Sequence, residues 1–293
     1  MRAAGLPPPP DEFLAATAPL AWRLSRSLCR HTNDDGITCA PFHGIWQALR
    51  RLELITTPWD QGAFFFAAFR SLARQGLRRV LVSGAADCAM PAVVHWAFAA
   101  AGVEPEITVL DVCETPLALC ARFAARHGLD WTLVAADIAD YRPSRTYDVV
   151  CTHSFLGNFP PPGRRALLER WRDLLVAGGG LVSVNRLRPG APERVGFGAD
   201  QAAAFRARVM AAADQGEPLG IPAADLAQLA EDYIRHRVVH PLGSEGELRR
   251  LVEDAGFLIE ALTVAPVAGR AAAAAGPTLP GGADYACFVA RRG

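Results

Sequence analysis

The feature that most constrains the fold is an alternation of short apolar strands and longer helices between residues 78 and 187. Runs such as "RRVLVSG", "EITVLDV" and "TYDVVCTH" are rich in β-branched side chains, and helical patterns separate most of them. Parallel neighbouring strands need long crossover connections, which helices of ten or more residues supply. The alternation therefore predicts an α/β fold with a parallel, doubly wound sheet.

Helical patterns flank and interrupt this alternation. From Asp11 to about Arg74, apolar side chains recur every three to four positions and no paired strands are seen, which predicts an N-terminal helical cap or lid over 1–74. At 188–243 two further helices, at about 198–214 and 222–238, form a predicted insertion after the fifth strand. We therefore expect one α/β domain over 75–293 with two helical additions.

The C-terminal part returns to the α/β pattern. Ser244 and Glu247 form a capping box, which predicts the start of a helix. The chain then closes with the apolar runs "FLIEALTVA" and "ADYACFVARR". Because the low-complexity link between them, residues 269–283, is rich in glycine and proline, the two runs are predicted to pair as antiparallel strands joined by a loose loop.

Charge and hydropathy exclude several classes of function. Lys+Arg and Asp+Glu total 30 each, so no excess of positive charge favours nucleic acid or an anionic membrane as a partner. The start of the chain has no apolar leader, and the longest apolar run, near residues 90–103, is too short to span a membrane. We expect a cytoplasmic protein with a small-molecule substrate, and the choice between monomer and homodimer stays open.

The seven cysteines are interpreted mainly as buried free thiols, because no CxxC pair occurs and several lie in expected core strands. One group, Cys29, His31, Cys39 and His43, consists of zinc-ligand residue types. Its spacing is irregular and lacks the paired knuckle of known zinc motifs. The pattern therefore favours a helix end, a polar loop and a second helix, and no metal is predicted, with a metal site as the alternative.

Ligands of open α/β sheets lie at the carboxyl ends of the strands. The loop "SGAADCAM" after the first strand has one turn glycine, Gly84, and matches neither dinucleotide nor P-loop fingerprints. Asp87 in this loop would repel a pyrophosphate and could face an ammonium group. Asp111 ends the second strand and can accept ribose hydroxyls, and Asp137 ends the third and can accept an adenine amine. This set predicts a cationic amino-acid nucleoside, although such acids also commonly cap helices.

Five segments together resemble the class I S-adenosylmethionine-dependent methyltransferase family. "VLVSGAADCAM", "ITVLDVCETPL" and "VAADIADY" resemble its first three motifs, and "TYDVVCTHSFLGNF" and "LLVAGGGLVSV" resemble its fourth and fifth strands. The resemblance runs from Arg78 to Arg292. It implies a Rossmann-like seven-stranded sheet of order 3-2-1-4-5-7-6 with an antiparallel last strand. It also implies S-adenosyl-L-methionine as cofactor, with S-adenosylhomocysteine or methylthioadenosine as product.

Carried over by position, the resemblance makes Gly84 the loop glycine, Asp111 the ribose acid and Asp137 the adenine-side acid. Ala86 and Cys88 stand where the family's loop usually carries glycines. The predicted cofactor site comprises Ser83, Gly84, Ala85, Asp87, Asp111, Val112, Cys113, Asp137, Ile138, Thr152 and His153.

Two residues are candidates for catalysis on the acceptor side. His153 ends the fourth strand and can act as a general base, with a structural or adenine-packing histidine as the alternative. Asn158 in "GNFPPP" is similar to the asparagine of NPPY-type motifs, although Phe159 intervenes and a proline turn before a helix is the alternative. The predicted substrate wall and lid comprise His43, Trp46, Phe65, Phe155, Asn185 and Arg186, with plain core packing as the alternative for the "FFF" run.

These features predict in-line methyl transfer from S-adenosylmethionine to a small biosynthetic acceptor, with proximity supplying most of the rate. Two alternatives stay open. One is an enzyme that uses the same cofactor without methylating an acceptor, for example an intramolecular cyclase that forms azetidine-2-carboxylate and methylthioadenosine. The other is a non-catalytic binding or scaffold protein on the same fold.

Overall fold

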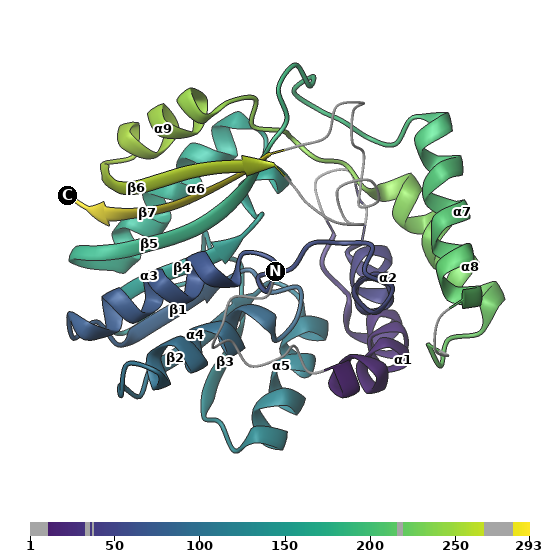
Figure 1. Ribbon diagram of the computed structural model, residues 1–293, viewed down its shortest axis with the longest axis horizontal. Coiled ribbons are helices and arrows are strands. Elements are labelled where there is room, and N and C mark those ends of the chain that lie inside the picture. Colours follow the sequence, from purple (N-terminus) through teal and green to yellow (C-terminus); the bar gives the residue numbers. More distant parts are fainter. Residues whose placement is uncertain (1–10, 33–35, 37, 216–218, 267–283) are drawn as a thin grey trace.

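A computed structural model describes residues 11–32, 36, 38–215, 219–266 and 284–293. It contains a seven-stranded sheet of order β3-β2-β1-β4-β5-β7-β6, which confirms the predicted fold (Figure 1). β1 to β5 run parallel, and β7 is antiparallel to both of its neighbours. The strands are β1 Arg79–Ser83, β2 Glu106–Asp111, β3 Trp131–Ala135, β4 Tyr147–His153, β5 Leu175–Leu187, β6 Phe257–Pro266 and β7 Asp284–Arg292.

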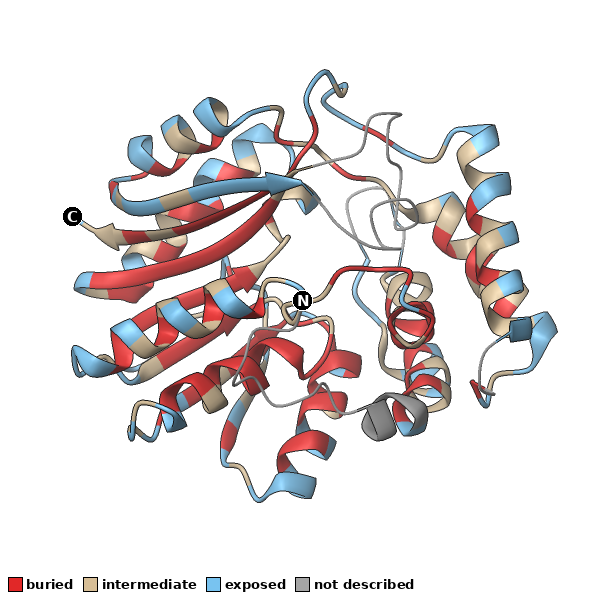
Figure 2. Cartoon of the chain, viewed as in Figure 1, coloured by how far each residue is buried: buried red, intermediate tan, exposed pale blue. Residues whose placement is uncertain are grey.

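Helices cover both faces of the sheet because successive strand residues point to opposite sides. Val80 and Val82 of β1 pack with helices α3, α4 and α5, whereas Leu81 between them packs with α6 and α9. The central strands are buried along most of their length (Figure 2). The covering helices are α3 Gly62–Arg74, α4 Ala89–Ala99, α5 Glu114–His127, α6 Pro161–Leu174 and α9 Glu245–Asp254.

A third hydrophobic core lies outside the sheet. It joins Ile45 and Leu49 of α2 to Phe205 of α7 and Tyr233 of α8. The helices α1 Asp11–Leu28, α2 Ala40–Arg51, α7 Ala199–Gln215 and α8 Ala223–His236 lie together on one side of the molecule (Figure 1), and we call them the helical cap. The two helices of the insertion lie within two residues of their predicted bounds.

The segment 1–74 was predicted as one cap, but its described residues contribute to two different layers. α1 and α2 belong to the helical cap, whereas α3 packs directly on the sheet face. Phe65 and Phe69 carry this packing, since both are fully buried and their rings stack with centroids 5.8 Å apart. The middle aromatic of the "FFF" run therefore forms core.

The glycines after α6 lie in a strand, although the helix was predicted to run up to them. α6 ends at Leu174, and Leu175 is already extended. A Cβ on Gly179 would lie 2.9 Å from the carbonyl oxygen of Val176 and 3.1 Å from that of Asp148. The glycines thus let β5 bulge closely against β4, where the register shifts.

The capping box at α9 is confirmed, with one difference in its second half. Ser244 Oγ accepts a hydrogen bond from the Glu247 N–H at 3.1 Å. The Glu247 carboxylate accepts instead from the Gly243 N–H at 2.7 Å. The Gly/Pro-rich link at 269–283 lies outside the described residues, but the β6–β7 pair that it joins is antiparallel as predicted. Across the described ranges, every helix is too short or too polar to cross a bilayer.

Candidate functional site

A cavity of about 510 Å³ lies where the carboxyl ends of the strands meet the helical cap. Its size falls within the usual range of small-molecule sites. Its lining contains most of the predicted cofactor and substrate residues, drawn from the strand ends and from the cap. These are Ser83, Gly84, Ala85, Asp87, Asp111, Val112, Asp137, Ile138, His153, Asn158, His43, Trp46, Phe155 and Arg186.

Two predicted site residues point away from the cavity because of strand alternation. Thr152 is fully buried and does not line the cavity, since its neighbour His153 occupies the face of β4 that does. Asn185 is likewise buried in the sheet, where its amide donates to Ser183 Oγ at 2.8 Å and accepts from the Leu156 N–H at 3.3 Å. Asn185 thus holds the backbone at Leu156, whereas the buried Thr152 hydroxyl has no hydrogen-bond partner among the described residues.

Two others lie in different surroundings from those predicted. Phe65 belongs to the core between α3 and the sheet and does not reach the cavity. Cys113 is also absent from the lining, because its thiol turns toward Cys29, 3.4 Å away. His43 contacts the same thiol of Cys29, with Nδ1 at 3.4 Å from Sγ. The sequence pattern grouped Cys29, Cys39 and His43, and the structure adds Cys113 in place of His31.

The turn after β1 depends on its single glycine. Gly84 has φ +75°, and a Cβ there would lie 2.4 Å from the ring of Phe155. Ser154 also has positive φ, +52°, which is uncommon for a residue with a side chain and is typical of functional turns. This strained turn after β4 places the Phe155 ring against the loop. One glycine is therefore required here, and its neighbours Ala85 and Ala86 line the cavity without being glycine.

Asp111 sits at the centre of the predicted nucleoside end. Its Oδ2 accepts from the Ala85 N–H and its Oδ1 from the Cys113 N–H, both at 2.8 Å. Burial raises the pKa of this carboxyl to about 6, although His43 and the two N–H groups oppose the rise. Asp111 thus fixes the β1 and β2 turns together and keeps a face on the cavity.

Asp137 is the more accessible acid. It is exposed, lines the cavity and accepts from the Ala139 N–H at 2.8 Å. Asp140, the competing acid of the same segment, does not line the cavity. The geometry thus favours Asp137 over Asp140 for a contact with a ligand.

Asp87 is bound to the helical cap. It forms a buried ion pair with Arg50 of α2, and both side chains are 4% exposed. It also accepts from Gln47 Nε2 and from the Ala89 N–H, each at 2.8 Å. Because Arg50 already balances its charge, Asp87 joins the cap to the first loop, and its predicted contact with an ammonium group stays a prediction.

His153 lies in a buried polar group at the end of β4. Its Nε2 is 2.8 Å from Gln61 Oε1, and its ring centroid is 6.0 Å from that of Tyr285. Burial, followed by the positive charge of Arg186, lowers the pKa of His153 to about 3, against an opposing effect of Asp87. At neutral pH the ring is therefore uncharged and a weak base.

Asn158 lies in the short 3-10 helix η1, Leu156–Asn158, at the rim of the cavity. Its Oδ1 accepts from Arg237 Nη1 at 2.9 Å. The Arg237 guanidinium also lies over the Phe42 ring, 5.4 Å from its centroid. In this state Asn158 positions an arginine of the cap.

Arginines form the cavity wall opposite the acids, and only Arg186 among them was predicted. Arg186, Arg188, Arg194 and Arg237 all line the cavity. Burial, and then the charges of Arg186 and Arg237, lower the pKa of Arg188 to about 10. Arg186 also donates to the Tyr285 hydroxyl at 3.1 Å. The cavity thus has an acidic end at β1–β3 and a basic end at β5 and α8.

Residues 91–179 match the family model described as "Methyltransferase domain". The match covers under a third of the chain and contains β2, β3, β4 and their helices. The strand order of the whole sheet is the one that the sequence resemblance implied. The resemblance to class I S-adenosylmethionine-dependent methyltransferases is confirmed.

The match to the methyltransferase model begins at Pro91, just after the loop that carries Gly84. This boundary agrees with the departures at Ala86 and Cys88, where the family usually has glycines. S-adenosylmethionine, the predicted cofactor, is the cofactor of this family. A search of curated proteins finds no match to the sequence.

Several solved methyltransferase structures are similar to this chain at low identity. The N-methyltransferase NodS from Bradyrhizobium japonicum WM9, in complex with S-adenosylhomocysteine, has 12% identity and a TM-score of 0.47, covering 94% of this chain and 98% of its own. Magnesium protoporphyrin IX methyltransferase ChlM from Synechocystis PCC 6803 has 13% identity and a TM-score of 0.48, with 97% and 98% covered. The family model and the strand order, and not these low similarities, support the resemblance to class I methyltransferases.

The cavity residues that the sequence analysis missed come from segments outside the region matched by the family model. Arg188 follows β5 in "NRLRPG", a strand end that sequence reasoning could have included. Arg237 and Tyr285 belong to α8's end and to β7, and no local pattern marks them as site residues. Their contribution depends on how the cap and the last strand fold over the sheet.

Proposed function

We propose that this chain transfers the methyl group of S-adenosylmethionine to a small acceptor that carries an anionic group. The observation that supports it best is the polarity of the cavity, with acids at the β1–β3 ends and arginines at the β5 and α8 ends. A cationic nucleoside suits the first end, and a carboxylate or phosphate suits the second.

The cofactor end has a surface suited to a nucleoside. Val112 is apolar yet 40% exposed, and both Val112 and the buried Ile138 line the cavity. A flat adenine ring laid between them would cover this exposed apolar surface. Asp137 would then accept from the exocyclic amine, and Asp111 from the ribose hydroxyls. The Gly84 loop would follow the methionine part of the cofactor.

The acceptor end lies farther along the same edge of the sheet, at the carboxyl end of β5. β5 is separated from β1 by β4, and neighbouring strands lie about 4.8 Å apart, so the arginines after β5 start about 10 Å from the Gly84 loop. Arg186 and Arg237 both disfavour the charge of Arg188, which is 6% exposed. A bound anion would relieve this repulsion, and guanidinium groups bind carboxylates and phosphates in bidentate fashion.

The chemistry requires mainly orientation. The sulfonium of the cofactor supplies an activated methyl group, and the chain must hold the acceptor atom in line with it. His153, whose pKa burial lowers to about 3, is poorly matched to general-base work at neutral pH. We therefore infer that His153 and Tyr285 position the acceptor. The helical cap, fixed through Arg50 and Asp87, would exclude water from the reaction.

Product analysis tests this function directly. The protein is incubated with S-adenosylmethionine and a panel of small carboxylates and phosphates, together with the neutral amide or ester of each. We expect S-adenosylhomocysteine only when an acceptor is present, and faster with the anionic member of each pair. Methylthioadenosine formed without any acceptor would contradict methyl transfer, and equal rates within pairs would contradict the anionic acceptor.

A pair of variants tests the cofactor end by calorimetry. Asp111→Asn keeps the shape of the side chain but removes its charge and one of the two oxygens that accept from the Ala85 and Cys113 N–H groups. We expect at least about tenfold weaker binding of S-adenosylmethionine, since hydrogen bonds to charged groups contribute about 1.5–3 kcal/mol. Asp140→Asn, from an acid that does not line the cavity, serves as the matched control. Unchanged affinity in Asp111→Asn would refute its assignment to the ribose.

A further inference from the structure

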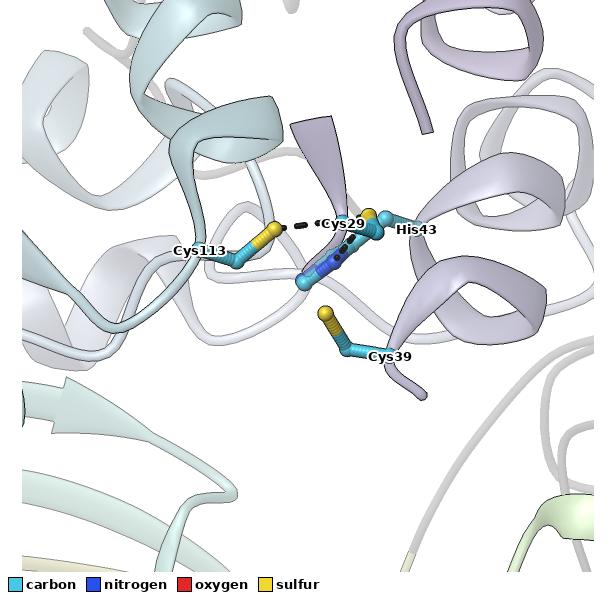
Figure 3. A group of neighbouring side chains, drawn as sticks. All are labelled: Cys29, Cys39, His43 and Cys113. Atoms are coloured by element: carbon cyan, nitrogen blue, oxygen red, sulfur yellow. Dashed lines mark hydrogen bonds between the residues drawn. The ribbon is translucent and has the colours of Figure 1, made fainter. Parts of the chain in front are cut away.

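Four potential metal ligands converge beside the cavity from three separate segments. Cys29 follows α1, Cys39 and His43 stand at the start of α2, and Cys113 lies between β2 and α5. Figure 3 shows their side chains pointing toward one another. The three thiol sulfurs and one imidazole nitrogen all lie within 4.8 Å of one another.

The spacing of these atoms is close to that of a tetrahedral zinc site. With Zn–S bonds of about 2.3 Å, sulfurs at the corners of a tetrahedron lie roughly 3.8 Å apart. Cys29 Sγ lies 3.4 Å from both Cys113 Sγ and His43 Nδ1. A small expansion of the group would admit an ion at its centre. Three cysteines and one histidine form a common ligand set of structural zinc.

The helices also favour negative charge at this place. Cys39 and Cys113 are the N-cap residues of α2 and α5, and neither thiol caps its own helix. Helix N-termini stabilise thiolates, which are the form that binds metal. Thr115 Oγ1 lies 3.2 Å from Cys29 Sγ and can donate to that sulfur as an outer contact.

We propose that Cys29, Cys39, His43 and Cys113 bind one Zn²⁺ ion in a closed structural site. Binding would form three Zn–S bonds and one Zn–N bond, and the thiol protons would go to solvent. With all four positions taken by the protein, the ion has no open position for substrate. Its role is to link the end of α1 and the start of α2 in the helical cap to the β2–α5 turn.

This link has a consequence for the cofactor end that rests on the proposed function. The Cys113 N–H donates to Asp111, the proposed ribose acid, and Cys39 and His43 line the cavity. Zinc would therefore hold the Asp111 turn and the adjoining cap in one arrangement. Loss of the ion should loosen both while the sheet stays folded.

The first test is metal content, which needs no cofactor. The full chain is purified under reducing conditions without metal-affinity resin or chelator, and its metals are measured by mass spectrometry. We expect about one equivalent of Zn²⁺ per chain, as for a four-ligand structural site. After chelation, added Co²⁺ should produce a thiolate charge-transfer band that saturates at one equivalent.

Matched alanine variants locate the site. Cys29→Ala and Cys113→Ala should lose the stoichiometric metal and the cobalt band. Cys120→Ala and Cys151→Ala remove fully buried thiols elsewhere in the core and should keep both. Cys39→Ala, at a half-buried position, provides a further ligand variant if Cys113→Ala does not fold.

Folded wild-type protein with only trace zinc and no cobalt band would overturn the proposal, as would full metal content in Cys29→Ala. A Cys29–Cys113 disulfide that is already present in the purified protein and persists under reducing conditions with added metal would also overturn it, and thiol counting detects this. Metal content and cofactor binding are measured separately. A protein that holds zinc but does not bind S-adenosylmethionine would therefore contradict only the proposed function.

Discussion

The two ends of the cavity are built in different ways. The acidic end comes from consecutive strand ends of one sheet, so Asp111 and Asp137 are placed by the local order of strand and turn. The basic end combines Arg188 after β5, Arg237 after α8 and Tyr285 in β7. The sheet therefore places Asp111 and Asp137 by itself, although Asp87 of the same end also binds the cap, whereas the basic end requires the helical cap and the last strand to be in place.

This difference suggests a division of labour. In the proposed function, the sheet end would bind the cofactor that the methyltransferase family shares, and the cap end would bind the acceptor. Arg50 of the cap pairs with Asp87 of the first loop, so the two ends are joined by a buried charge pair. Four substitutions test this comparison between the two ends, beginning with the Arg50–Asp87 ion pair that joins them.

Arg50→Met should have the largest effect, because it leaves the carboxylate of Asp87 buried without its ionic partner. Breaking one side of a buried pair typically costs about 3–5 kcal/mol of unfolding free energy. Urea denaturation followed by circular dichroism measures this. The double variant Arg50→Met/Asp87→Asn should recover part of the loss, since it removes the uncompensated charge.

Arg165→Met serves as the control for Arg50→Met. Arg165 pairs with Glu169 on the exposed face of α6, and such a pair contributes about 0–1 kcal/mol. If the loss in Arg50→Met were as small as in this control, the cap would not be joined to the loop by charge.

Gly84→Ala should come next, because it combines backbone strain with a clash. A non-glycine residue at φ +75° costs about 1–2 kcal/mol, and the new methyl group would press on the Phe155 ring. Gly76→Ala is a matched control, since Gly76 has φ +83° and no atom within 4 Å of an added Cβ. Both are measured by thermal unfolding and by cofactor calorimetry.

We expect Gly76→Ala to show the strain alone and Gly84→Ala to show a larger loss together with weaker cofactor binding. In a Phe155→Ala background, Gly84→Ala should lose only as much unfolding free energy as Gly76→Ala does, because the ring that the new methyl group would press on is gone. Equal losses in the two single variants would mean that the Phe155 ring moves aside without cost.

The sequence predicted the sheet end of the cavity better than the cap end. The parallel sheet and the acids at its strand ends were predictable, because strands alternate with helices and the ligand edge of such a sheet is known in advance. The strand order came from the resemblance to the methyltransferase family. Thr152 was misplaced because neighbouring strand residues face opposite sides, and the pattern alone did not fix which side His153 takes. Asn185 faces inward for the same reason.

The remaining parts depend on contacts between distant segments. Cys113 joins Cys29 and His43 only because the end of α1 lies beside the β2–α5 turn. The sequence pattern joined Cys29 with His31 instead, since it could register only nearby residues. Arg237 is held at the cavity by its hydrogen bond to Asn158 and its contact with the Phe42 ring, and no spacing in the chain predicts those two contacts.

Arg188→Met tests the acceptor end and should have an intermediate effect. Methionine keeps much of the side-chain volume but removes the charge that would bind an anionic acceptor. We expect KM for such an acceptor to rise about tenfold or more, since charge-assisted hydrogen bonds contribute about 1.5–3 kcal/mol, while Kd for S-adenosylmethionine stays within about twofold. Asp111→Asn should give the reverse pattern, and an equal effect of both variants on both ligands would remove the distinction between the ends.

His153→Gln should have the smallest effect, and it appears in the pH dependence of stability. Because burial and Arg186 lower the pKa of His153 to about 3, the folded protein keeps this ring neutral while the unfolded chain protonates it near pH 6.5. The contribution of the neutral His153 ring to the free energy of unfolding is therefore complete above about pH 6.5 and is lost as the pH falls toward 3. Between pH 7 and pH 5 the wild type should lose about 1–2 kcal/mol more unfolding free energy than His153→Gln, which does not titrate. Urea titrations of both proteins at the two pH values measure this difference.

The same variant tests the role of His153 in activity. Glutamine can still hydrogen-bond to Gln61, so methyl transfer should fall only modestly and show no pH break near 6.5. A loss of activity of several orders of magnitude would instead identify His153 as the base, and would mean that the acceptor raises its pKa on binding.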